Sequence, residues 1–261
     1  MIDVLVAGAG GRMGREVVKA VTEASGMRVV AAVDPGCSGI TLHAGPSDDI
    51  VCTEDLLSAI EGTAPHVMVD FTHPEAVEDN LRTALEHEVD CVVGTTGISM
   101  SALETLAADA PEGTCLFVAP NFAIGAVLMM RFAQQAARHM PHVEIIELHH
   151  DRKADAPSGT ALRTAALIAD ARALSPEAPR RETEVADGAR GAFVQDVAVH
   201  SVRLPGLVAH QEVLFGGQGQ TLSIRHDSID RTSFMPGVIL AVRRVGELSG
   251  LVVGLETLLE A

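Results

Sequence analysis

The sequence contains no tryptophan or tyrosine, and its aromatic content is only 3%. Proteins that bind single-stranded nucleic acid stack bases on aromatic side chains, of which this chain has few. Basic residues are also scarce, with 19 Lys and Arg against 35 Asp and Glu and a net charge of −16. This balance argues against nucleic acid or an anionic membrane as a partner, because both attract basic surfaces. An anionic ligand therefore requires a local basic pocket.

The four cysteines, Cys37, Cys52, Cys91 and Cys115, are widely spaced and form no CxxC pair. Neither a zinc site nor a disulfide framework is predicted, and we expect reduced, buried thiols of a cytoplasmic protein. The sequence also lacks a charged leader and a long apolar run, so neither a signal peptide nor a membrane span is expected. Its 261 residues, 47% of them hydrophobic, are enough for one large or two medium domains.

A glycine-rich turn follows the first predicted strand, Ile2–Ala7, and precedes a predicted helix, Arg15–Ala24. The turn reads Gly8-Ala9-Gly10-Gly11-Arg12-Met13-Gly14, with the spacing GxGGxxG. Glycines at such a turn allow the backbone to approach a pyrophosphate, which the amino terminus of the helix then binds. The spacing differs slightly from the usual GxGxxG, and a glycine turn that joins two elements for purely steric reasons is the alternative to a dinucleotide site.

Asp34 ends the next predicted strand, Arg28–Val33, and lies 20 residues after Gly14. Dinucleotide-binding folds place at this distance the acid that binds the ribose 2′-hydroxyl. A carboxylate there repels a 2′-phosphate, and Pro35 supplies no compensating cation. The sequence therefore favours NADH over NADPH. Arg12 is the one nearby cation that could make NADPH acceptable; alternatively, its side chain is simply solvated.

Predicted strands and helices alternate through the first half, which is typical of a Rossmann-like, doubly wound parallel sheet. Loops that are rich in small or polar residues follow the strands, and ligands of such folds lie above the strand ends. The further predicted strands are His66–Asp70, Cys91–Val93 and Thr114–Val118, and the further helices are Glu54–Glu61 and Glu75–His87. We therefore expect a crevice lined by residues 8–14, 34, 70–72 (including Phe71), 94–96 and 119–122, with Gly36–Asp49 as a loop.

The segment Glu144–Ala161 concentrates groups that suit a small anion. Val143–Leu148 is predicted as a strand with one buried face, and His149 and His150 follow it. Ser158 is a good helix N-cap before the predicted helix Thr160–Ala173, whose first amides, including that of Gly159, suit a carboxylate. Lys153 lies between strand and helix, where its ammonium can neutralise the ligand or donate a proton.

The second half is predicted to be a separate α+β domain with an open, mostly antiparallel sheet. After a long helix, Ile124–Met140, and the segment just described, Leu174–Gly191 is predicted to be an exposed loop. The strand-like runs Val197–Leu204, Val208–Phe215 and Gln220–His226 then suggest an antiparallel meander. Helices predicted over Pro236–Glu247 and Leu251–Glu260 are too little for a third domain and are expected to pack against the first.

Five motifs, in order over both halves, closely resemble the 4-hydroxy-tetrahydrodipicolinate (dihydrodipicolinate) reductase family. They are GAGGRMG, DFTHPE, VVGTTG, APNF and ELHHDRKADAPSGTA, of which the last is the most specific. The resemblance implies a dinucleotide domain of residues 1–122, completed by 232–261, and a substrate-binding and oligomerisation domain of residues 123–231. RTSF, Arg231–Phe234, marks the return to the first domain. The family is a cytoplasmic homotetramer that acts in diaminopimelate and lysine biosynthesis and uses no metal.

By this resemblance His149 and Lys153 are the catalytic proton donors, and a cyclic imine dicarboxylate is the substrate. His150, Ser158, Gly159 and Thr160 are implied to bind that substrate. The implied nucleotide contacts are Gly8, Ala9, Gly10, Gly11, Arg12, Met13, Asp34, Gly94, Thr95, Thr96, Ala119, Pro120, Asn121 and Phe122. Many members have an acid followed by arginine, whereas this chain has Asp34-Pro35, so NADH or NADPH use stays open.

Three alternatives remain at the level of sequence. One is a hydrolase in which the histidines, with Asp151 and Asp155, are zinc ligands, although neighbours on a strand diverge and the helical spacing of zinc-binding histidines is missing. Another two-domain oxidoreductase would share only the nucleotide half and would not depend on Lys153. A non-catalytic NADH sensor would not oxidise NADH with the cyclic substrate.

Overall fold

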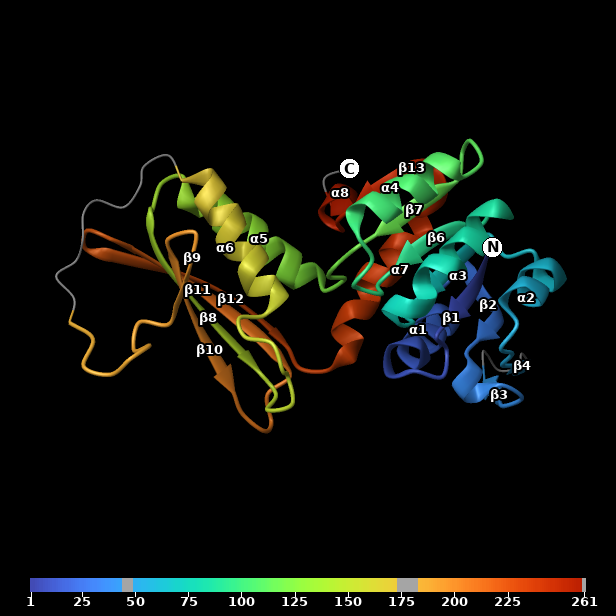
Figure 1. Ribbon diagram of the computed structural model, residues 1–261, viewed down its shortest axis with the longest axis horizontal. Coiled ribbons are helices and arrows are strands. Elements are labelled where there is room, and N and C mark those ends of the chain that lie inside the picture. The colour runs from blue at the N-terminus through green and yellow to red at the C-terminus, as the bar shows by residue number, and fades with distance from the viewer. Residues whose placement is uncertain (44–48, 173–182, 260–261) are drawn as a thin grey trace. The chain divides into compact units, whose positions relative to one another are not determined.

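The computed structural model describes residues 1–43, 49–172 and 183–259 (Figure 1). The chain forms two compact units, the first made of Met1–Ile124 with Phe234–Ala261 and the second of Gly125–Ser233. Within the described ranges, no helix is both long enough and apolar enough to cross a lipid bilayer. Each unit has its own sheet, so each is described by itself.

The first unit is built on a six-stranded parallel sheet in the order β13-β7-β6-β5-β1-β2. Its strands are β1 (Ile2–Ala7), β2 (Met27–Val33), β5 (Val67–Asp70), β6 (Asp90–Val93), β7 (Cys115–Val118) and β13 (Gly250–Val253). From β1 the chain proceeds to β2 on one side and to β5 on the other. The direction of winding thus reverses at β1, and the adjacent strand ends are where such folds bind ligands. The predicted Rossmann-like class is confirmed.

Helices cover both faces of this sheet. They are α1 (Arg12–Glu23), α2 (Leu56–Thr63), α3 (Pro74–Glu86), α4 (Met100–Asp109), α7 (Met235–Arg244) and α8 (Glu256–Leu259), with short 3₁₀ turns η1 (Pro35–Cys37), η2 (Arg231–Phe234) and η3 (Val245–Glu247). One buried cluster joins strand residues to α2, α3 and α4 and includes Leu5, Met68, Leu81, Leu103 and Leu116. Strand side chains that alternate with these face α1 and α7, which contact each other. Burial on both faces explains why the strands are nearly continuous apolar runs.

Two predictions for this unit need correction. The apolar run predicted as a helix over Leu251–Glu260 instead forms β13, which pairs in parallel with β7, followed by the short helix α8; residue 260 lies outside the described residues. A run as short as residues 251–253 suits a strand or a buried helix equally, and pairing with the edge strand β7 decides between them. The helix α4 was not predicted; Ser99 caps its amino terminus by accepting a hydrogen bond from the amide of Ala102.

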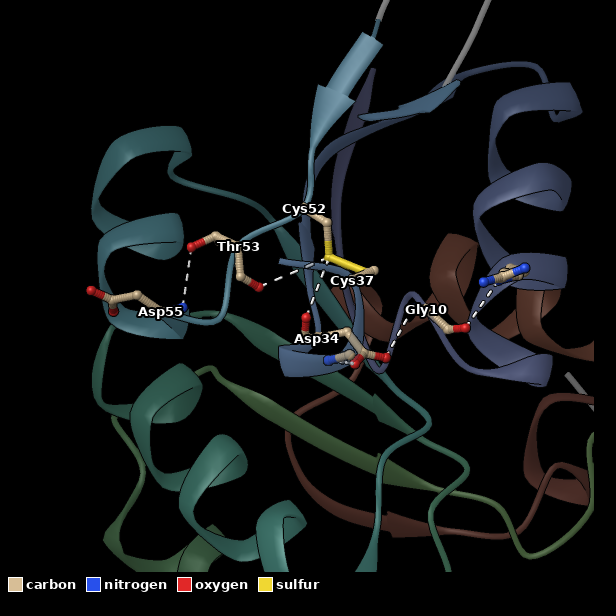
Figure 2. The surroundings of a disulfide bond; sticks show 8 residues. Gly10, Asp34, Cys37, Cys52, Thr53 and Asp55 are labelled. Carbon is tan, nitrogen blue, oxygen red and sulfur yellow. Dashed lines mark hydrogen bonds between the residues drawn. A yellow bond between two sulfur atoms is a disulfide. The ribbon is translucent and has the colours of Figure 1, made fainter. Parts of the chain in front are cut away.

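A small hairpin and a disulfide lie beyond the end of β2, where a loop was predicted. β3 (Thr41–His43) pairs with β4 (Asp49–Val51), and residues 44–48 of the predicted loop lie outside the described residues. A bridge between Val33 and Thr53 returns the chain to β2 and brings Cys37 within a Cα distance of 5.9 Å from Cys52. These two residues form a disulfide (Figure 2), so the prediction of four reduced thiols was wrong for this pair. Spacing alone does not reveal a contact that the sheet creates.

The other two cysteines agree with the prediction. Cys91 in β6 and Cys115 in β7 are free and fully buried. Burial raises the pKa of the Cys115 thiol to about 12 and that of Cys91 well above its ordinary value. Both side chains therefore act as small apolar core residues rather than as reactive thiols.

The second unit packs two helices, α5 (Ile124–Ala137) and α6 (Gly159–Ala171), on one face of a five-stranded sheet (Figure 1). The strand order is β12-β11-β8-β10-β9. The strands are β8 (His142–His149), β9 (Ala192–Val194), β10 (Val197–Arg203), β11 (Ala209–Gly217) and β12 (Gln220–Ser228). The predicted α+β class is confirmed. The ends of two predicted segments, Thr160–Ala173 and Leu174–Gly191, lie partly outside the described residues, which omit 173–182.

The predicted meander is wrong in one respect. β11 and β12 form the expected antiparallel hairpin, but β8 lies between β10 and β11 and pairs with β10 in parallel. The register places Arg203 of β10 opposite His149 of β8. Two residues that are far apart in the sequence thus meet at the end of β8, within or beside the predicted anion-binding segment Glu144–Ala161.

Candidate active site

The glycine-rich turn between β1 and α1 is shaped by close backbone approach. Gly8 has φ +80°, and an added Cβ there would lie 2.3 Å from the carbonyl oxygen of Phe71. At Gly14 a Cβ would lie 2.0 Å from the carbonyl oxygen of Gly8. Gly11 occupies the N-cap position of α1 and offers no capping side chain. The turn is therefore tight, and the positive end of α1 is left without a capping side chain, which suits a pyrophosphate.

Asp34 stands at the end of β2 with both carboxylate oxygens held by backbone amides. Oδ2 accepts from the amide of Gly10 at 2.9 Å, and Oδ1 accepts from the amide of Gly36 at 2.7 Å (Figure 2). The disulfided Cys52 lies against the same residue, with its Sγ 3.6 Å from the carbonyl oxygen of Asp34. The carboxylate is thus oriented by the glycine turn before any ligand binds.

A cavity of about 490 Å³ lies above the ends of β1, β2, β5 and β6. Nine of the predicted nucleotide contacts line it: Gly8, Gly11, Arg12, Met13, Asp34, Phe71, Gly94, Thr95 and Thr96. Six others do not: Ala9, Gly10, Ala119, Pro120, Asn121 and Phe122. Phe122 instead packs under the site, with its ring centroid 5.8 Å from that of Phe71. The turn at Gly8 and the oriented Asp34 fit the pyrophosphate and ribose of a dinucleotide.

A buried carboxylate within the predicted crevice residues 70–72, although not predicted as a nucleotide contact, holds together the loops of this cavity. Asp70, at the end of β5, is 0% exposed. Its Oδ1 accepts hydrogen bonds from the hydroxyls of Thr95 at 2.6 Å and Thr72 at 2.8 Å, and its Oδ2 accepts from Asn80 at 2.9 Å. Asp70 therefore ties the loop after β5 to the loop after β6, both of which line the cavity.

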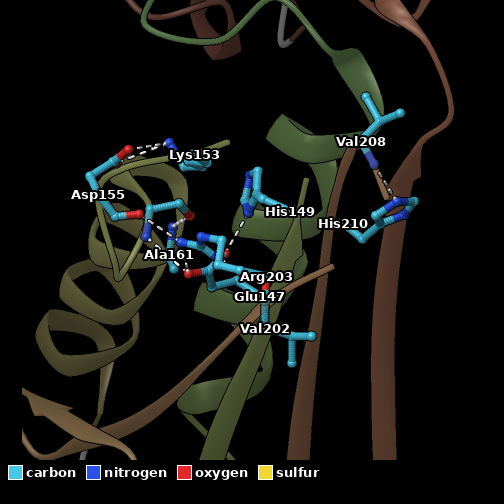
Figure 3. A network of polar contacts seen from close by, with 10 residues as sticks. Glu147, His149, Lys153, Asp155, Ala161, Val202, Arg203, Val208 and His210 are labelled. Atoms are coloured by element: carbon cyan, nitrogen blue, oxygen red, sulfur yellow. Dashed lines mark hydrogen bonds and ion pairs between the residues drawn. The ribbon is translucent and has the colours of Figure 1, made fainter. Parts of the chain in front are cut away.

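A second polar network lies in the second unit, at the end of β8. Glu147 is 0% exposed, and its Oε2 lies 2.5 Å from Nδ1 of His149 (Figure 3). Arg203 donates to both carboxylate oxygens, at 2.9 Å and 2.8 Å, and the amide of Ser158 donates to Oε1 at 3.3 Å. Glu147 and Arg203 were not predicted as site residues. The burial pattern of β8 puts Glu147 on its buried face, and an acid on such a face is the signal that could have identified it.

The pKa values at this network follow from burial and from the neighbouring charges. Burial lowers the pKa of the His149 imidazole below its ordinary value, although the hydrogen bond with Glu147 opposes this shift. Burial acts to raise the pKa of Glu147, but the hydrogen bonds from Arg203 and His149 outweigh it and hold that pKa below its ordinary value. Glu147 is therefore a carboxylate at neutral pH.

Lys153 and His150 flank this network. The ammonium of Lys153 donates to both carboxylate oxygens of Asp155, at 2.7 Å and 2.9 Å, and its side chain is 23% exposed. Among the described residues, Nδ1 of His150 is buried and has no hydrogen-bond partner. A buried ring nitrogen without a partner is an available donor or acceptor for a ligand. The positive charge of Lys153 and this nitrogen suit an anionic substrate.

The first turn of α6 completes the candidate substrate site. Ser158 is the N-cap, and its hydroxyl accepts from the amide of Ala161 at 3.2 Å. Gly159 and Thr160 open the helix, where the positive end of the helix dipole favours a carboxylate. The predicted substrate residues thus lie on one stretch of chain around α6 and β8. No group of three His, Cys, Asp or Glu side chains in the described ranges is arranged to hold a metal ion.

Known proteins match the chain along its whole length. Two sequence families, described as "Dihydrodipicolinate reductase, N-terminus" and "Dihydrodipicolinate reductase, C-terminus", match residues 2–122 and 125–259. The 4-hydroxy-tetrahydrodipicolinate reductase of Moorella thermoacetica is 51% identical over 99% of this chain and 98% of its own. That of Mycolicibacterium smegmatis is also 51% identical, over 98% of each chain.

A solved structure agrees with these relatives. The dipicolinate-bound dihydrodipicolinate reductase from Paenisporosarcina sp. TG-14 is 43% identical, covers 98% of this chain and 99% of its own, and has a TM-score of 0.87. Both the glycine-turn unit and the unit with the histidine network are therefore shared with it. The chain belongs to the dihydrodipicolinate reductase family.

Proposed function

We propose that the chain reduces 4-hydroxy-tetrahydrodipicolinate, with loss of water, to tetrahydrodipicolinate at the expense of NADH or NADPH. This is a step of diaminopimelate and lysine biosynthesis. The full-length similarity to reductases of this name carries the proposal. The substrate is a cyclic dicarboxylate, and the second unit offers Lys153, His150 and the amino terminus of α6 to its two negative charges.

The first unit is proposed to bind the dinucleotide, which supplies a hydride when bound. The turn at Gly8 and the amino terminus of α1 hold the pyrophosphate, and Asp34 accepts a hydrogen bond from the ribose 2′-hydroxyl. A carboxylate at this position repels the 2′-phosphate of NADPH, while Arg12 in the cavity lining partly compensates. We therefore propose that NADH is favoured and NADPH is tolerated.

Asp34→Asn tests this preference, because it removes the charge while one oxygen can still accept from a backbone amide. The ratio of kcat/KM for NADH to that for NADPH is expected to fall by at least about tenfold, which corresponds to about 1.4 kcal/mol. Glu54→Gln removes an equal charge from the lining of the same cavity and should leave the ratio unchanged. Equal shifts in both variants would contradict the role of Asp34.

We further propose that His149 and Lys153 supply the protons of the reaction. The reduced ring gains negative charge as hydride arrives, and a positioned proton donor lowers that barrier. Nδ1 of His149 is occupied by Glu147, so Nε2 is the nitrogen left to face a substrate. Lys153 needs only to leave its exposed partner Asp155 to approach the same ligand.

Nicotinamide absorbance, with substrate generated in situ from pyruvate and aspartate semialdehyde, measures the effect of His149→Gln and Lys153→Met. Each change is expected to lower kcat about 10²- to 10⁴-fold. His139→Gln, at an exposed position of the unit that contains His149, and Lys19→Met, at an exposed position of α1, are matched controls that should retain turnover. Near-normal turnover of the Lys153 variant would favour another type of two-domain oxidoreductase.

A homotetramer is proposed as the working assembly. The sheet face of the second unit that α5 and α6 leave open carries Ile146, Leu148 and Leu214 among paired charges. An apolar strip on an open sheet face is suited to a second sheet. Light scattering on the eluting protein should give about four times the chain mass of 27.3 kDa. A monomer mass would contradict this assembly.

A further inference from the structure

The Glu147 carboxylate is buried and accepts four hydrogen bonds from three residues on three parts of the chain. His149 lies two residues further along β8, Arg203 reaches it from β10 with two nitrogens, and the amide of Ser158 reaches it from the start of α6. A buried carboxylate is costly unless it is paired, and this one is fully paired. Such a complete shell around one acid, beside a proposed proton donor, indicates a role beyond packing.

We propose that Glu147, itself held by Arg203, is a positioning residue that keeps the His149 ring with a proton on Nδ1 and Nε2 directed to the substrate. This inference rests on the proposed function of His149 and explains how that ring is held ready to donate a proton to the substrate. An ionised carboxylate only accepts hydrogen bonds, so the short contact to Glu147 assigns the proton to Nδ1. In the charged imidazolium Nε2 then carries the transferable proton.

Arg203 also helps to position Lys153, the second proposed proton donor. Besides Glu147, its guanidinium donates to the carbonyl oxygen of Asp155 at 2.7 Å. Asp155 is the residue that holds the Lys153 ammonium. One carboxylate and one guanidinium therefore fix both the ring of His149 and the loop that carries Lys153 (Figure 3). This arrangement connects β8, β10 and the segment before α6.

The charges around His149 determine what happens when Glu147 is neutralised. Burial, Lys153 and Arg203 all lower the pKa of His149, and Glu147 is the neighbour that raises it. β11 contributes no charge at this point, because its residue opposite His149 is Ala209. Removing the Glu147 charge leaves Arg203 uncompensated next to the ring, so the pKa of His149 is expected to fall further. Fewer imidazolium rings are then present at neutral pH.

Glu147→Gln is the decisive variant, with Glu144→Gln as its matched control. Glu144 lies on the same strand and is held in a similar way, by Arg190 and by Nε2 of His200 at 2.8 Å, but it makes no bond to His149. Glu147→Gln should lower kcat at least about 10- to 100-fold, the range known for loss of the carboxylate partner of a metal-bound histidine, with little change in KM for substrate. Its kcat should also begin to decline at a lower pH than in the wild type, and the control should keep the wild-type profile.

Nitrogen-15 spectra of histidine-labelled protein provide a readout that does not depend on turnover. The His149 signals, identified by their loss in His149→Gln, should show a protonated Nδ1 in neutral wild-type protein. In Glu147→Gln the titration midpoint of His149 should move to lower pH, and in Glu144→Gln it should not move. A purely structural role for Glu147 would reduce stability while leaving the midpoint unchanged, and that result would overturn the proposal.

The experiments distinguish failure of the proposed catalytic role of His149 from failure of the proposed positioning role of Glu147. If His149→Gln retains full activity, the catalytic role of His149 fails, whereas the coupling between Glu147 and the ring is still tested by the spectra. If Glu147→Gln does not fold, the wild-type spectrum decides: a His149 ring with its neutral-form proton on Nε2 contradicts the proposal without any substitution. Arg203→Lys, which removes the bidentate fork, should shift the His149 midpoint in folded protein, and no shift would count against the role of Arg203.

Discussion

Gly14→Ala is expected to damage the nucleotide site through a backbone collision. The added Cβ would lie 2.0 Å from the carbonyl oxygen of Gly8, 2.7 Å from its carbonyl carbon and 2.8 Å from Cα of Ala9. All three atoms belong to the backbone of the turn, so no flexible side chain can yield. Contact distances of ~3.5 Å require α1 and the turn to separate by about 1 Å or more.

The change in the free energy of unfolding that Gly14→Ala should cause follows from two opposing effects. Overpacking costs about 1–3 kcal/mol, and the rigid neighbours place this site at about 3 kcal/mol. Alanine in a helix recovers about 1 kcal/mol relative to glycine. The free energy of unfolding should therefore fall by about 2 kcal/mol. Because the amides proposed to bind pyrophosphate move with the turn, the Kd for NADH should rise at least about tenfold.

Gly62→Ala is the matched control, since it makes the same change at an exposed position of α2, a helix of the same unit. Nothing lies within 4 Å of a Cβ built at Gly62, so the free energy of unfolding should rise by about 0.5–1 kcal/mol. Urea unfolding followed by circular dichroism measures stability, and NADH fluorescence measures binding without interference from tryptophan, which the chain lacks. A Gly14→Ala protein with wild-type stability and wild-type NADH affinity would refute the reasoning.

Three further predictions concern stability. Reducing the Cys37–Cys52 disulfide, whose cysteines are 15 residues apart, should lower the free energy of unfolding by about 3 kcal/mol; equal urea midpoints with and without dithiothreitol would argue against the pairing. The pKa of His149 in the folded protein lies below its value of about 6.5 in the unfolded chain. Its contribution to the free energy of unfolding is therefore fully present above about pH 6.5 and is lost as the pH falls toward the folded-state pKa. Relative to wild type, His149→Gln should therefore flatten the loss of stability between pH 7 and 5, and an unchanged slope would contradict this account. Phe117→Ala, at a fully buried position in β7, should cost about 3–5 kcal/mol by urea unfolding, and a cost below about 1 kcal/mol would mean that the core refills the space.

The first unit was largely predictable because its signals are local. Each parallel strand is a short apolar run, since both of its faces are buried, and glycine or polar residues follow it. Asp34 and the glycine turn were predicted as nucleotide contacts from their spacing, and in the structure the amide of Gly10 donates a hydrogen bond to the Asp34 carboxylate. The exception is β13, whose four residues carry no period that separates strand from helix.

The second unit depended more on contacts between distant residues. Sequence order suggested that β10 precedes a simple meander, whereas the structure inserts β8 beside it. That insertion brings Arg203 to Glu147 across 56 residues, and no local pattern encodes it. The disulfide between Cys37 and Cys52 likewise depends on the chain returning to the edge of β2.

The sequence by itself determined which segments we propose as the site, because the turn at Gly8, the spacing of Asp34 from that turn and the stretch from His149 to Thr160 are local patterns in the chain. Only the tertiary structure decided how these groups are supported. Asp70 and Glu147 are buried and Arg203 is partly buried, and their partners include residues of other elements, such as Asn80 of α3 for Asp70 and Arg203 of β10 for Glu147. The hydrogen bonds between different elements form only after strand pairing has set the register, and this is the physical reason why the order of residues along the chain did not reveal these partners.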